Sequence, residues 1–251
     1  MITIRKYVRA QSLEEAWQLN QDKLSRILGG MLWLRLGKGS VATAIDLCDL
    51  GIDKIEETPE QFSIGAMTTL RDLELHEGLN EYSCNAVANA VKSIVGVQFR
   101  NMATVGGSIW GRFGFSDVLT AFLALDSYVE LYKGGIVPLE QFVEMKADKD
   151  ILVRLIVKKT PCKVVYSSVR NQRTDFPVLA CAVARMNGEY RASIGARPAR
   201  AMLLRHDTAE GFAAYAADNA PTGDNVRGSA EYRKHLIKVL VERSVQELGG
   251  M

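Results

Sequence analysis

Two pairs of adjacent glycines, Gly29-Gly30 and Gly106-Gly107, set the strongest limits on how this chain folds. Glycine adopts backbone conformations that residues with a Cβ avoid, so each pair is predicted to form a turn that breaks any regular element. A glycine loop that leaves backbone N–H groups free can hold an anionic group, and a diphosphate is the obvious candidate. One pair alone is better explained by a simple tight turn, but a second pair in the same chain favours a binding site.

Regular elements on both sides of the first pair indicate a small unit that mixes strands and helices. Ser12 and Glu15 have the spacing of a capping box, which predicts a helix over 13–20. Beyond the glycines an apolar segment continues to Leu36, and the apolar residues of 44–47 predict a short buried strand. The N-terminal part of about 50 residues therefore indicates a compact β/α unit.

The sequence pattern changes twice after the second pair. Apolar residues recur at helical spacing from Val118 to Leu125, and Ser116 or Asp117 is a suitable N-cap for that helix. Alternation of side chains over 128–132 then predicts a strand with one buried face. The second glycine pair is thus expected close to a helix start, where backbone N–H groups can hold an anion.

The remaining chain is predicted to form further strands and helices, and it contains no internal repeat or low-complexity tract. Asn187-Gly188 lies between two apolar runs and is typical of a β-hairpin turn. Strands are predicted within 55–62 and over 151–157, 164–169, 178–184 and 190–194, and a strand followed by a short helix is predicted within 136–142. Helices are predicted after Thr69 and over 85–94, 208–218 and 229–248.

Length, charge and cysteines narrow the class of protein. A chain of 251 residues with 47% hydrophobic residues is long enough for two or three subdomains, and a net charge of +2 disfavours a nucleic-acid partner. The four cysteines are scattered, which argues against a metal or iron–sulfur site in this chain and fits a reducing compartment. No apolar run has the length of a signal peptide or a membrane span, so we expect a cytoplasmic protein with no membrane partner.

Three segments together resemble the FAD-binding (medium) subunit of molybdenum hydroxylases, the family of xanthine dehydrogenase and carbon monoxide dehydrogenase. Leu28-Gly-Gly-Met-Leu-Trp-Leu34 is similar to the first flavin loop of that family. Arg100-Asn-Met-Ala-Thr-Val-Gly-Gly-Ser-Ile109 and Asp117-Val-Leu-Thr-Ala-Phe-Leu-Ala-Leu-Asp126 are similar to its second. The likeness covers essentially the whole chain in the same order, and the second loop is the more specific motif.

The resemblance implies an α+β fold. A two-subdomain α/β FAD-binding domain of the PCMH or vanillyl-alcohol-oxidase type would occupy 1–160, with subdomains of about 1–54 and 55–160. A C-terminal flavoprotein domain over 161–251 would follow, with a small antiparallel sheet packed on helices. The segment Lys158-Lys159-Thr-Pro161, at the exit of the strand predicted over 151–157, is a credible boundary between the two domains.

The resemblance also assigns residues that would hold FAD. Backbone N–H groups of both loops would face the diphosphate, and the hydroxyls of Thr104 and Ser108 would add donors. Asp117 would accept hydrogen bonds from the sugar-like chain of the flavin or from the ribose, or would cap its helix, and the two roles are compatible. The implied set is Gly29, Gly30, Met31, Leu32, Thr104, Val105, Gly106, Gly107, Ser108 and Asp117.

Two departures from the family pattern bear on this site. Met31 and Leu32 stand where the family usually has Thr and Asp, so two polar contacts are missing and only the backbone can serve. Trp110-Gly-Arg-Phe-Gly-Phe115 replaces a segment that is normally small and polar. Its three aromatic rings can stack on the flavin or the adenine, or can pack within this subunit or against a partner. Arg112 can neutralise phosphate charge or lie exposed to solvent.

The resemblance implies an electron-transfer flavoprotein subunit without an acid–base pair or nucleophile of its own. It would pair with a molybdopterin-binding subunit and a two-iron two-sulfur subunit, and would pass electrons through FAD to NAD or another acceptor. Met31 and Leu32 leave an alternative, a flavin-free subunit retained for the assembly of such a complex. A third hypothesis is a stand-alone flavin reductase, which predicts turnover of NADH with a dye in the absence of partners.

Overall fold

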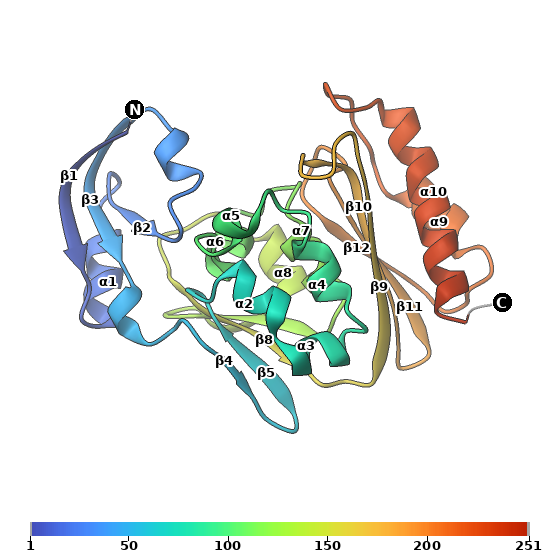
Figure 1. Ribbon diagram of the computed structural model, residues 1–251, viewed down its shortest axis with the longest axis horizontal. Coiled ribbons are helices and arrows are strands. Elements are labelled where there is room, and N and C mark those ends of the chain that lie inside the picture. Colours follow the sequence, from blue (N-terminus) through green and yellow to red (C-terminus); the bar gives the residue numbers. More distant parts are fainter. Residues whose placement is uncertain (1, 250–251) are drawn as a thin grey trace.

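In residues 2–249, which the computed structural model describes, three β-sheets follow one another along the chain (Figure 1). The N-terminal sheet lies at one end of the molecule (Figure 1). The C-terminal sheet lies at the other end, together with the two helices that cover it (Figure 1). A five-stranded sheet and most of the short helices lie between them. This mixture of sheets and helices confirms the predicted α+β fold class.

The N-terminal sheet is parallel, with the strand order β1-β3-β2. Its helix α1 (Leu13–Asn20) has the predicted bounds, and the Ser12 hydroxyl caps it by accepting from the N–H of Glu15. The sequence pattern does not reveal β1, because Arg5 and Lys6 interrupt the apolar alternation and most of the strand is exposed. The strands are β1 (Ile2–Arg9), β2 (Arg26–Leu28) and β3 (Gly39–Asp46), and a 3-10 turn follows at Cys48–Leu50.

The middle sheet is antiparallel, and its order β4-β5-β8-β6-β7 places β8 between two strands that precede it in the chain. The chain leaves the sheet after β5 and passes through helices α2 to α7 before β6 begins. Thr69 caps α2 and forms a capping box with Asp72, as its sequence position predicts. The strands are β4 (Ile55–Glu57), β5 (Gln61–Gly65), β6 (Ser127–Leu131), β7 (Gly135–Pro138) and β8 (Leu152–Lys158). The helices are α2 (Leu70–Leu75), α3 (Glu77–Tyr82), α4 (Ala86–Val91), α5 (Val97–Arg100), α6 (Val105–Trp110), α7 (Asp117–Leu123) and α8 (Leu139–Glu144).

The second glycine pair does not form the predicted break. Gly106 and Gly107 lie in the first turn of α6, and the Thr104 hydroxyl caps that helix by accepting from the N–H of Gly107. A Cβ on Gly106 would lie 2.7 Å from the carbonyl oxygen of Ala66, so glycine lets the helix approach that segment closely. Gly106 therefore serves helix packing, which the sequence pattern does not distinguish from a turn.

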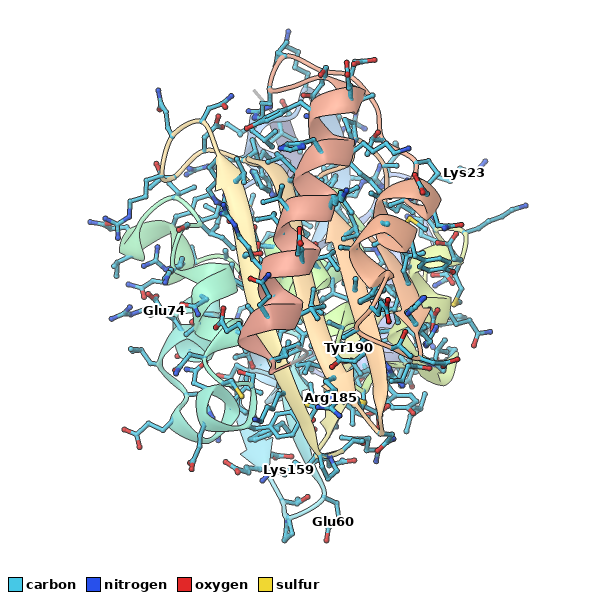
Figure 2. All side chains as sticks on the ribbon, turned by 90° about the vertical axis from the view of Figure 1, so that its right-hand side faces the viewer. Lys23, Glu60, Glu74, Lys159, Arg185 and Tyr190 are labelled. Carbon is cyan, nitrogen blue, oxygen red and sulfur yellow. The ribbon has the colours of Figure 1, made fainter. Side chains whose placement is uncertain are left out.

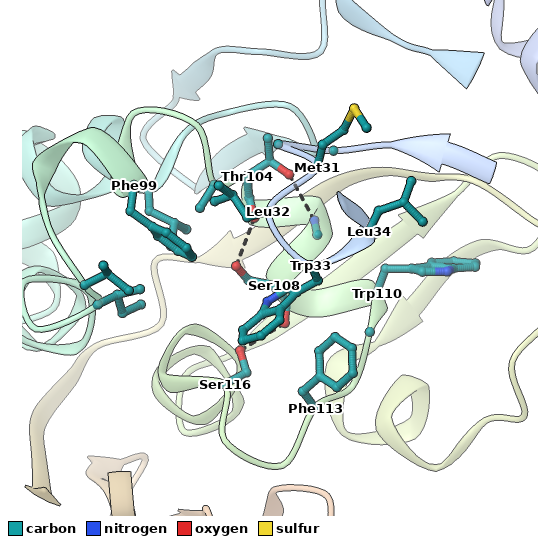
Figure 3. Close-up of a pocket in the computed structure, with 18 of the residues that line it drawn as sticks. Met31, Leu32, Trp33, Leu34, Phe99, Thr104, Ser108, Trp110, Phe113 and Ser116 are labelled. Carbon is teal, nitrogen blue, oxygen red and sulfur yellow. Dashed lines mark hydrogen bonds between the residues drawn. The ribbon is translucent and has the colours of Figure 1, made fainter. Parts of the chain in front are cut away.

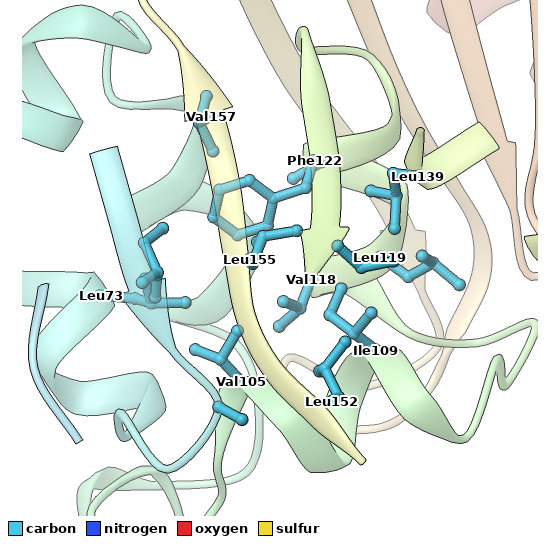
Figure 4. Packing of buried hydrophobic residues seen from close by; sticks show 14 of the residues in the cluster. Leu73, Val105, Ile109, Val118, Leu119, Phe122, Leu139, Leu152, Leu155 and Val157 are labelled. Atoms are coloured by element: carbon cyan, nitrogen blue, oxygen red, sulfur yellow. The ribbon is translucent and has the colours of Figure 1, made fainter. Parts of the chain in front are cut away.

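Helices α6 and α7 pack on β8 at the centre of the main core (Figure 4). Val105 and Ile109, four residues apart on α6, form one buried face of that helix. Because Gly106 and Gly107 belong to the same helix, the buried contacts of this face fix the second glycine loop on the main core. The other core residues that Figure 4 labels are Leu73, Val118, Leu119, Phe122, Leu139, Leu152, Leu155 and Val157.

The C-terminal sheet is antiparallel, with the order β12-β11-β10-β9. The predicted hairpin is confirmed, since Asn187 and Gly188 adopt φ values of 53° and 85° between β10 and β11. Helix α10 lies across the outer face of this sheet (Figures 1 and 2). The elements are β9 (Cys162–Arg170), β10 (Pro177–Met186), β11 (Glu189–Gly195), β12 (Met202–His206), α9 (Phe212–Asn219) and α10 (Ala230–Glu247).

Strand β10 lies between two hydrophobic clusters, and its two faces carry side chains of different size. Ala180, Ala182 and Ala184 belong to the main core, on the face that packs against α7. The residues that alternate with these alanines belong to the cluster under α9 and α10, and they are Leu179, Cys181 and Val183. The alanine face lets α7 lie close to the sheet.

The predicted boundaries at about 54 and at 160 stay predictions, although β8 ends at Lys158 and β9 begins at Cys162. Between residues 2 and 249 no helix is both long and apolar enough to cross a membrane.

Candidate functional site

A cavity of about 700 Å³ opens where the N-terminal unit, the middle helices and the C-terminal sheet meet (Figure 3). Its walls include most of 26–41, parts of 94–118 and the hairpin that joins β9 to β10. A second cavity of about 450 Å³ adjoins it, because Gly29, Thr104 and Gly107 line both. The fold thus brings the two glycine loops, which are distant in sequence, to a single site.

The first glycine loop offers backbone donors that the protein itself does not use. Within residues 2–249, no protein atom accepts a hydrogen bond from the N–H groups of Gly29, Gly30, Met31 or Leu32. Met31 has a φ of 59°, a left-handed conformation that non-glycine residues seldom adopt. Free N–H groups in such a loop can hold a diphosphate, so apolar side chains at positions 31 and 32 do not remove this capacity.

The glycines of the first pair are required for contact between the two loops. A Cβ on Gly30 would lie 1.7 Å from the carbonyl oxygen of Met102, and a Cβ on Gly29 would lie 2.8 Å from the Thr104 hydroxyl. Gly107 differs, because a Cβ there would meet only that same hydroxyl, at 3.2 Å. Among the four glycines of the two pairs, Gly107 is therefore the one whose missing side chain leaves room in the cavity.

The second loop uses its backbone donors within the protein, contrary to the expectation that they would face a diphosphate. Two of the four N–H groups donate to carbonyl oxygens that precede α2, and the other two donate to the residue that caps α6. None of the four is therefore free for a ligand. The pairs are Val105 to Thr68, Gly106 to Ala66, Gly107 to the Thr104 hydroxyl and Ser108 to the Thr104 carbonyl, at 2.9, 2.7, 3.1 and 3.1 Å.

The hydroxyl of Thr104 is the donor that this loop still offers. It accepts from the N–H of Gly107, and no protein acceptor among the described residues takes its own proton. Ser108 differs, because its hydroxyl donates to the Thr104 carbonyl oxygen at 2.9 Å (Figure 3). Thr104 can therefore donate into the cavity without losing its role as a helix cap.

Asp117 lines the larger cavity with a carboxylate that is 5% exposed. Ser116 caps α7 by accepting from the N–H of Leu119, which settles the choice that the sequence left open. Oδ1 of Asp117 accepts from the hydroxyl of Tyr166 and, at 2.5 Å, from Nη2 of Arg170. Burial raises the pKa of Asp117 above its usual range, while the Arg170 charge and both hydrogen bonds act in the opposite direction.

Four aromatic rings form one wall of the larger cavity. Trp33 stacks on Phe176 with ring centres 5.5 Å apart, and Phe115 lies 4.4 Å from Phe176. Phe113 stacks on Phe115 at 5.2 Å, and Trp33 and Phe113 remain 45% and 41% exposed. Figure 3 shows Trp33 and Phe113 beside each other in the cavity. Sequence reasoning named Phe113 and Phe115 but missed the other two rings, because they come from separate parts of the chain. Trp110 lines both cavities and contacts Phe142 instead.

Arg112 fits neither of the roles expected for it. Its side chain is buried, with the residue 6% exposed, and its guanidinium carbon lies 3.8 Å from the ring centre of Phe142. Nε donates to the carbonyl oxygen of Phe142 at 2.9 Å. Burial lowers the pKa of this arginine. Arg112 therefore anchors the loop after α6 to α8 and is neither solvated nor part of the cavity wall.

The structure gathers nearly all of the predicted site residues around the two cavities. Val105 is the exception, because its side chain is fully buried in the core beneath them. Arg170 is a site residue that the sequence does not reveal, since nothing local links it to Asp117. The predicted residues that line the larger cavity are Gly29, Gly30, Met31, Leu32, Thr104, Gly107, Ser108 and Asp117, and Gly106 lines the smaller one.

Comparisons with known proteins found a matching family model and relatives that cover most of this chain. The family model of the FAD binding domain in molybdopterin dehydrogenase matches residues 2–159. The glyceraldehyde dehydrogenase medium chain of Sulfolobus acidocaldarius is 25% identical over 276 residues, with 96% of this chain and 97% of that protein covered. The xanthine dehydrogenase FAD-binding subunit of Escherichia coli O157:H7 is 25% identical over 286 residues, with 98% and 97% covered.

A solved structure supports the fold. Carbon monoxide dehydrogenase from Hydrogenophaga pseudoflava contains a chain that superimposes with a TM-score of 0.83 at 22% identity, over 97% of this chain and 96% of that one. The family match itself covers more than half of the sequence and includes both glycine loops and Asp117. The chain therefore belongs to the family of FAD-binding domains in molybdopterin dehydrogenases, and it is an FAD-binding oxidoreductase subunit of the molybdenum hydroxylase type.

Proposed function

We propose that this chain is the electron-transfer flavoprotein subunit of a molybdopterin-dependent hydroxylase or dehydrogenase. Bound FAD would supply the redox chemistry, taking electrons from the iron–sulfur clusters of a two-iron two-sulfur partner and passing them to NAD or another acceptor. Substrate oxidation would occur on a molybdopterin-binding partner. The residues of this chain then have to bind, orient and shield the flavin.

The observation that carries this proposal is the set of unused donors at the junction of the two cavities. The N–H groups of 29–32 have no protein acceptor among the described residues, and the Thr104 hydroxyl adds a donor from the opposite side. Arg26 and Lys38 also line the larger cavity and contribute positive charge. Convergent donors and positive charge suit a diphosphate, so its position would be at Gly29, Thr104 and Gly107.

The walls on either side of this junction suit the two ends of a dinucleotide. The exposed faces of Trp33 and Phe113 offer stacking surfaces for a planar ring. Asp117 offers a carboxylate oxygen to a hydroxyl group. These features favour a bound flavin over a purely structural cavity, although the side chains of Met31 and Leu32 add no hydrogen bonds.

An absorption spectrum between about 350 and 500 nm tests the proposal, because flavin absorbs there. The purified chain is measured before and after addition of FAD and desalting, and the same is done for the complex co-purified with its partners. We expect near one flavin per chain, at least in the complex. A matched control is Arg191→Met, which breaks a surface ion pair with Glu189 far from the cavity and should retain flavin.

A flavin-free assembly subunit is the alternative, and a specific feature favours it. The four backbone N–H groups of the second loop already donate to acceptors within the protein. The first loop has the apolar residues Met31 and Leu32 where polar side chains could contact a ligand. If FAD washes out of both the isolated chain and the complex, the alternative holds. Turnover of NADH with a dye by the isolated chain would instead support a stand-alone reductase.

A further inference from the structure

Arg170 reaches from the C-terminal sheet into the flavin-binding half of the molecule. It ends β9, and its Nη2 donates to Oδ1 of Asp117, which begins α7. Tyr166 lies four residues earlier on β9 and donates to the same oxygen. Residues four apart on a strand lie on one face, so both donors approach the carboxylate from the same side.

The two oxygens of Asp117 are therefore unequal. Oδ1 accepts from the Tyr166 hydroxyl and from the Arg170 guanidinium, whereas no hydrogen bond from another residue among 2–249 reaches Oδ2. Asp117 and Arg170 both line the larger cavity, and their side chains are 6% and 8% exposed. Oδ2 is not among the fully buried atoms of the described residues that lack a partner, so it is open to the cavity, where it can accept a hydrogen bond from water or from a hydroxyl of a ligand.

We propose that Arg170 is a positioning residue, which fixes Oδ1 of Asp117 so that Oδ2 accepts a hydrogen bond from a hydroxyl of the polyol chain of the ligand. This inference rests on the proposed function, because FAD supplies that chain. Arg170 also donates through Nη1 to the carbonyl oxygen of Asp175 at 2.5 Å, next to Phe176 of the aromatic wall. The Arg170 guanidinium thus holds both Asp117 and the segment before Phe176 in the cavity wall. Through Arg170 the C-terminal sheet contributes to a site whose proposed diphosphate-binding residues belong to the two earlier units of the chain.

The surroundings of Asp117 make Arg170 the main source of compensating charge. Helices α4 and α6, which pack on α7, contain no titratable side chain. Strands β10, β11 and β12 and helix α8 also pack on α7 and do contain titratable groups, but within residues 2–249 none of these forms an ion pair or hydrogen bond with Asp117. The titratable groups on those elements include Arg185 on β10, Arg191 on β11, Arg205 on β12 and Glu140 on α8.

The test is a double-mutant cycle on FAD affinity. Dissociation constants are measured by flavin fluorescence for the wild type, Arg170→Met, Asp117→Asn and the double variant, each in the complex if the isolated chain does not retain FAD. We expect Arg170→Met and Asp117→Asn each to weaken binding by about ten- to a hundredfold, the range for a hydrogen bond to a charged group. The double variant should be no weaker than either single variant. Arg170→Lys should restore part of the affinity, and Arg191→Met should have no effect.

A pH profile separates positioning from a merely structural role. Without Arg170, burial raises the pKa of Asp117 further, so the carboxylate is protonated over part of the accessible pH range. FAD affinity of Arg170→Met should then rise with pH, while the wild type and the double variant show no such slope. Additive effects in the cycle, or a slope that persists in the double variant, would overturn the inference.

The ligand-free chain gives a readout that does not depend on FAD. An acid whose pKa is raised in the folded state stabilises the fold at low pH and loses that contribution as the pH rises through the folded pKa. In urea unfolding, Arg170→Met should therefore lose stability with rising pH relative to the double variant. If this slope appears but no form of the wild type binds FAD, the proposed function and the ligand contact both fail, and Arg170 only neutralises Asp117. If FAD binds but no slope appears, the positioning inference alone fails.

Discussion

Replacing Gly107 by alanine should separate the stability of the fold from the binding of flavin. The change adds one methyl group inside α6, where alanine favours the helix by about 1 kcal/mol over glycine. The new Cβ would lie 3.2 Å from the Thr104 hydroxyl, a close contact that a shift of a few tenths of an ångström relieves. That shift offsets part of the helix gain, so the free energy of unfolding should change by less than about 1 kcal/mol.

Gly30→Ala provides the matched contrast. Its Cβ would lie 1.7 Å from the carbonyl oxygen of Met102, and backbone on both sides has to move. Such overpacking costs about 1 to 3 kcal/mol or more, which lowers the melting temperature of a chain of this size by about 3 °C or more. Thermal unfolding followed by circular dichroism measures both variants without ligand.

The loss of flavin affinity in Gly107→Ala should be larger than its small change in stability predicts. The methyl group of Gly107→Ala enters the junction of the cavities, so we expect its FAD dissociation constant to rise about tenfold or more while its melting temperature stays near that of the wild type. A Gly107→Ala variant that unfolds as readily as Gly30→Ala would show that both glycines serve packing alone. Unchanged flavin affinity in a stable Gly107→Ala variant would place the diphosphate away from this junction.

Three further predictions concern stability and reactivity. Arg100→Met removes one of the two arginines that pair with Glu74 and leaves Arg71, so urea unfolding at neutral pH should show a loss of about 1.5 to 3 kcal/mol that shrinks as acid protonates Glu74. Ser229→Ala removes the hydroxyl that caps α10 and should cost about 1 kcal/mol in the same assay, with flavin affinity unchanged. Burial raises the pKa of the Cys181 thiol to about 12, so a thiol reagent at pH 8 should label exposed Cys84 in the native chain and Cys181 only after unfolding. Fast native labelling of Cys181, or equal stability of the Arg100 and Ser229 variants with the wild type, would contradict these assignments.

Elements with a strong local signal could be predicted from the sequence. The capping residue Ser12 defines α1, and Asn187-Gly188 defines the hairpin between β10 and β11, because both act through neighbouring backbone groups. Strand β12 has no comparable signal, since it is an edge strand paired with β11 and ends in Arg205 and His206. Its existence depends on the sheet it joins.

The candidate site could be predicted only in part, for a similar reason. The glycine pairs mark where the chain comes close to something, but not whether that is a phosphate or another loop. Gly30 approaches Met102, and Gly106 approaches Ala66, so tertiary packing explains both. Arg170 enters the site because β9 docks beside α7, and no spacing in the sequence reports that contact.

The alanine face of β10 acts as a spacer of fixed width. Ala180, Ala182 and Ala184 have no side-chain rotamers, and Gly195 on the next strand would place a Cβ 2.1 Å from the Thr120 hydroxyl of α7. Larger residues on this face cannot be absorbed by a change of rotamer, so they would move the whole C-terminal sheet away from α7. On the opposite face, apolar residues of similar total volume can replace one another. During evolution or design, the face of β10 under α9 and α10 therefore tolerates substitutions between apolar residues. The alanine face, which packs on α7, has to stay small to preserve the distance across which Arg170 reaches Asp117.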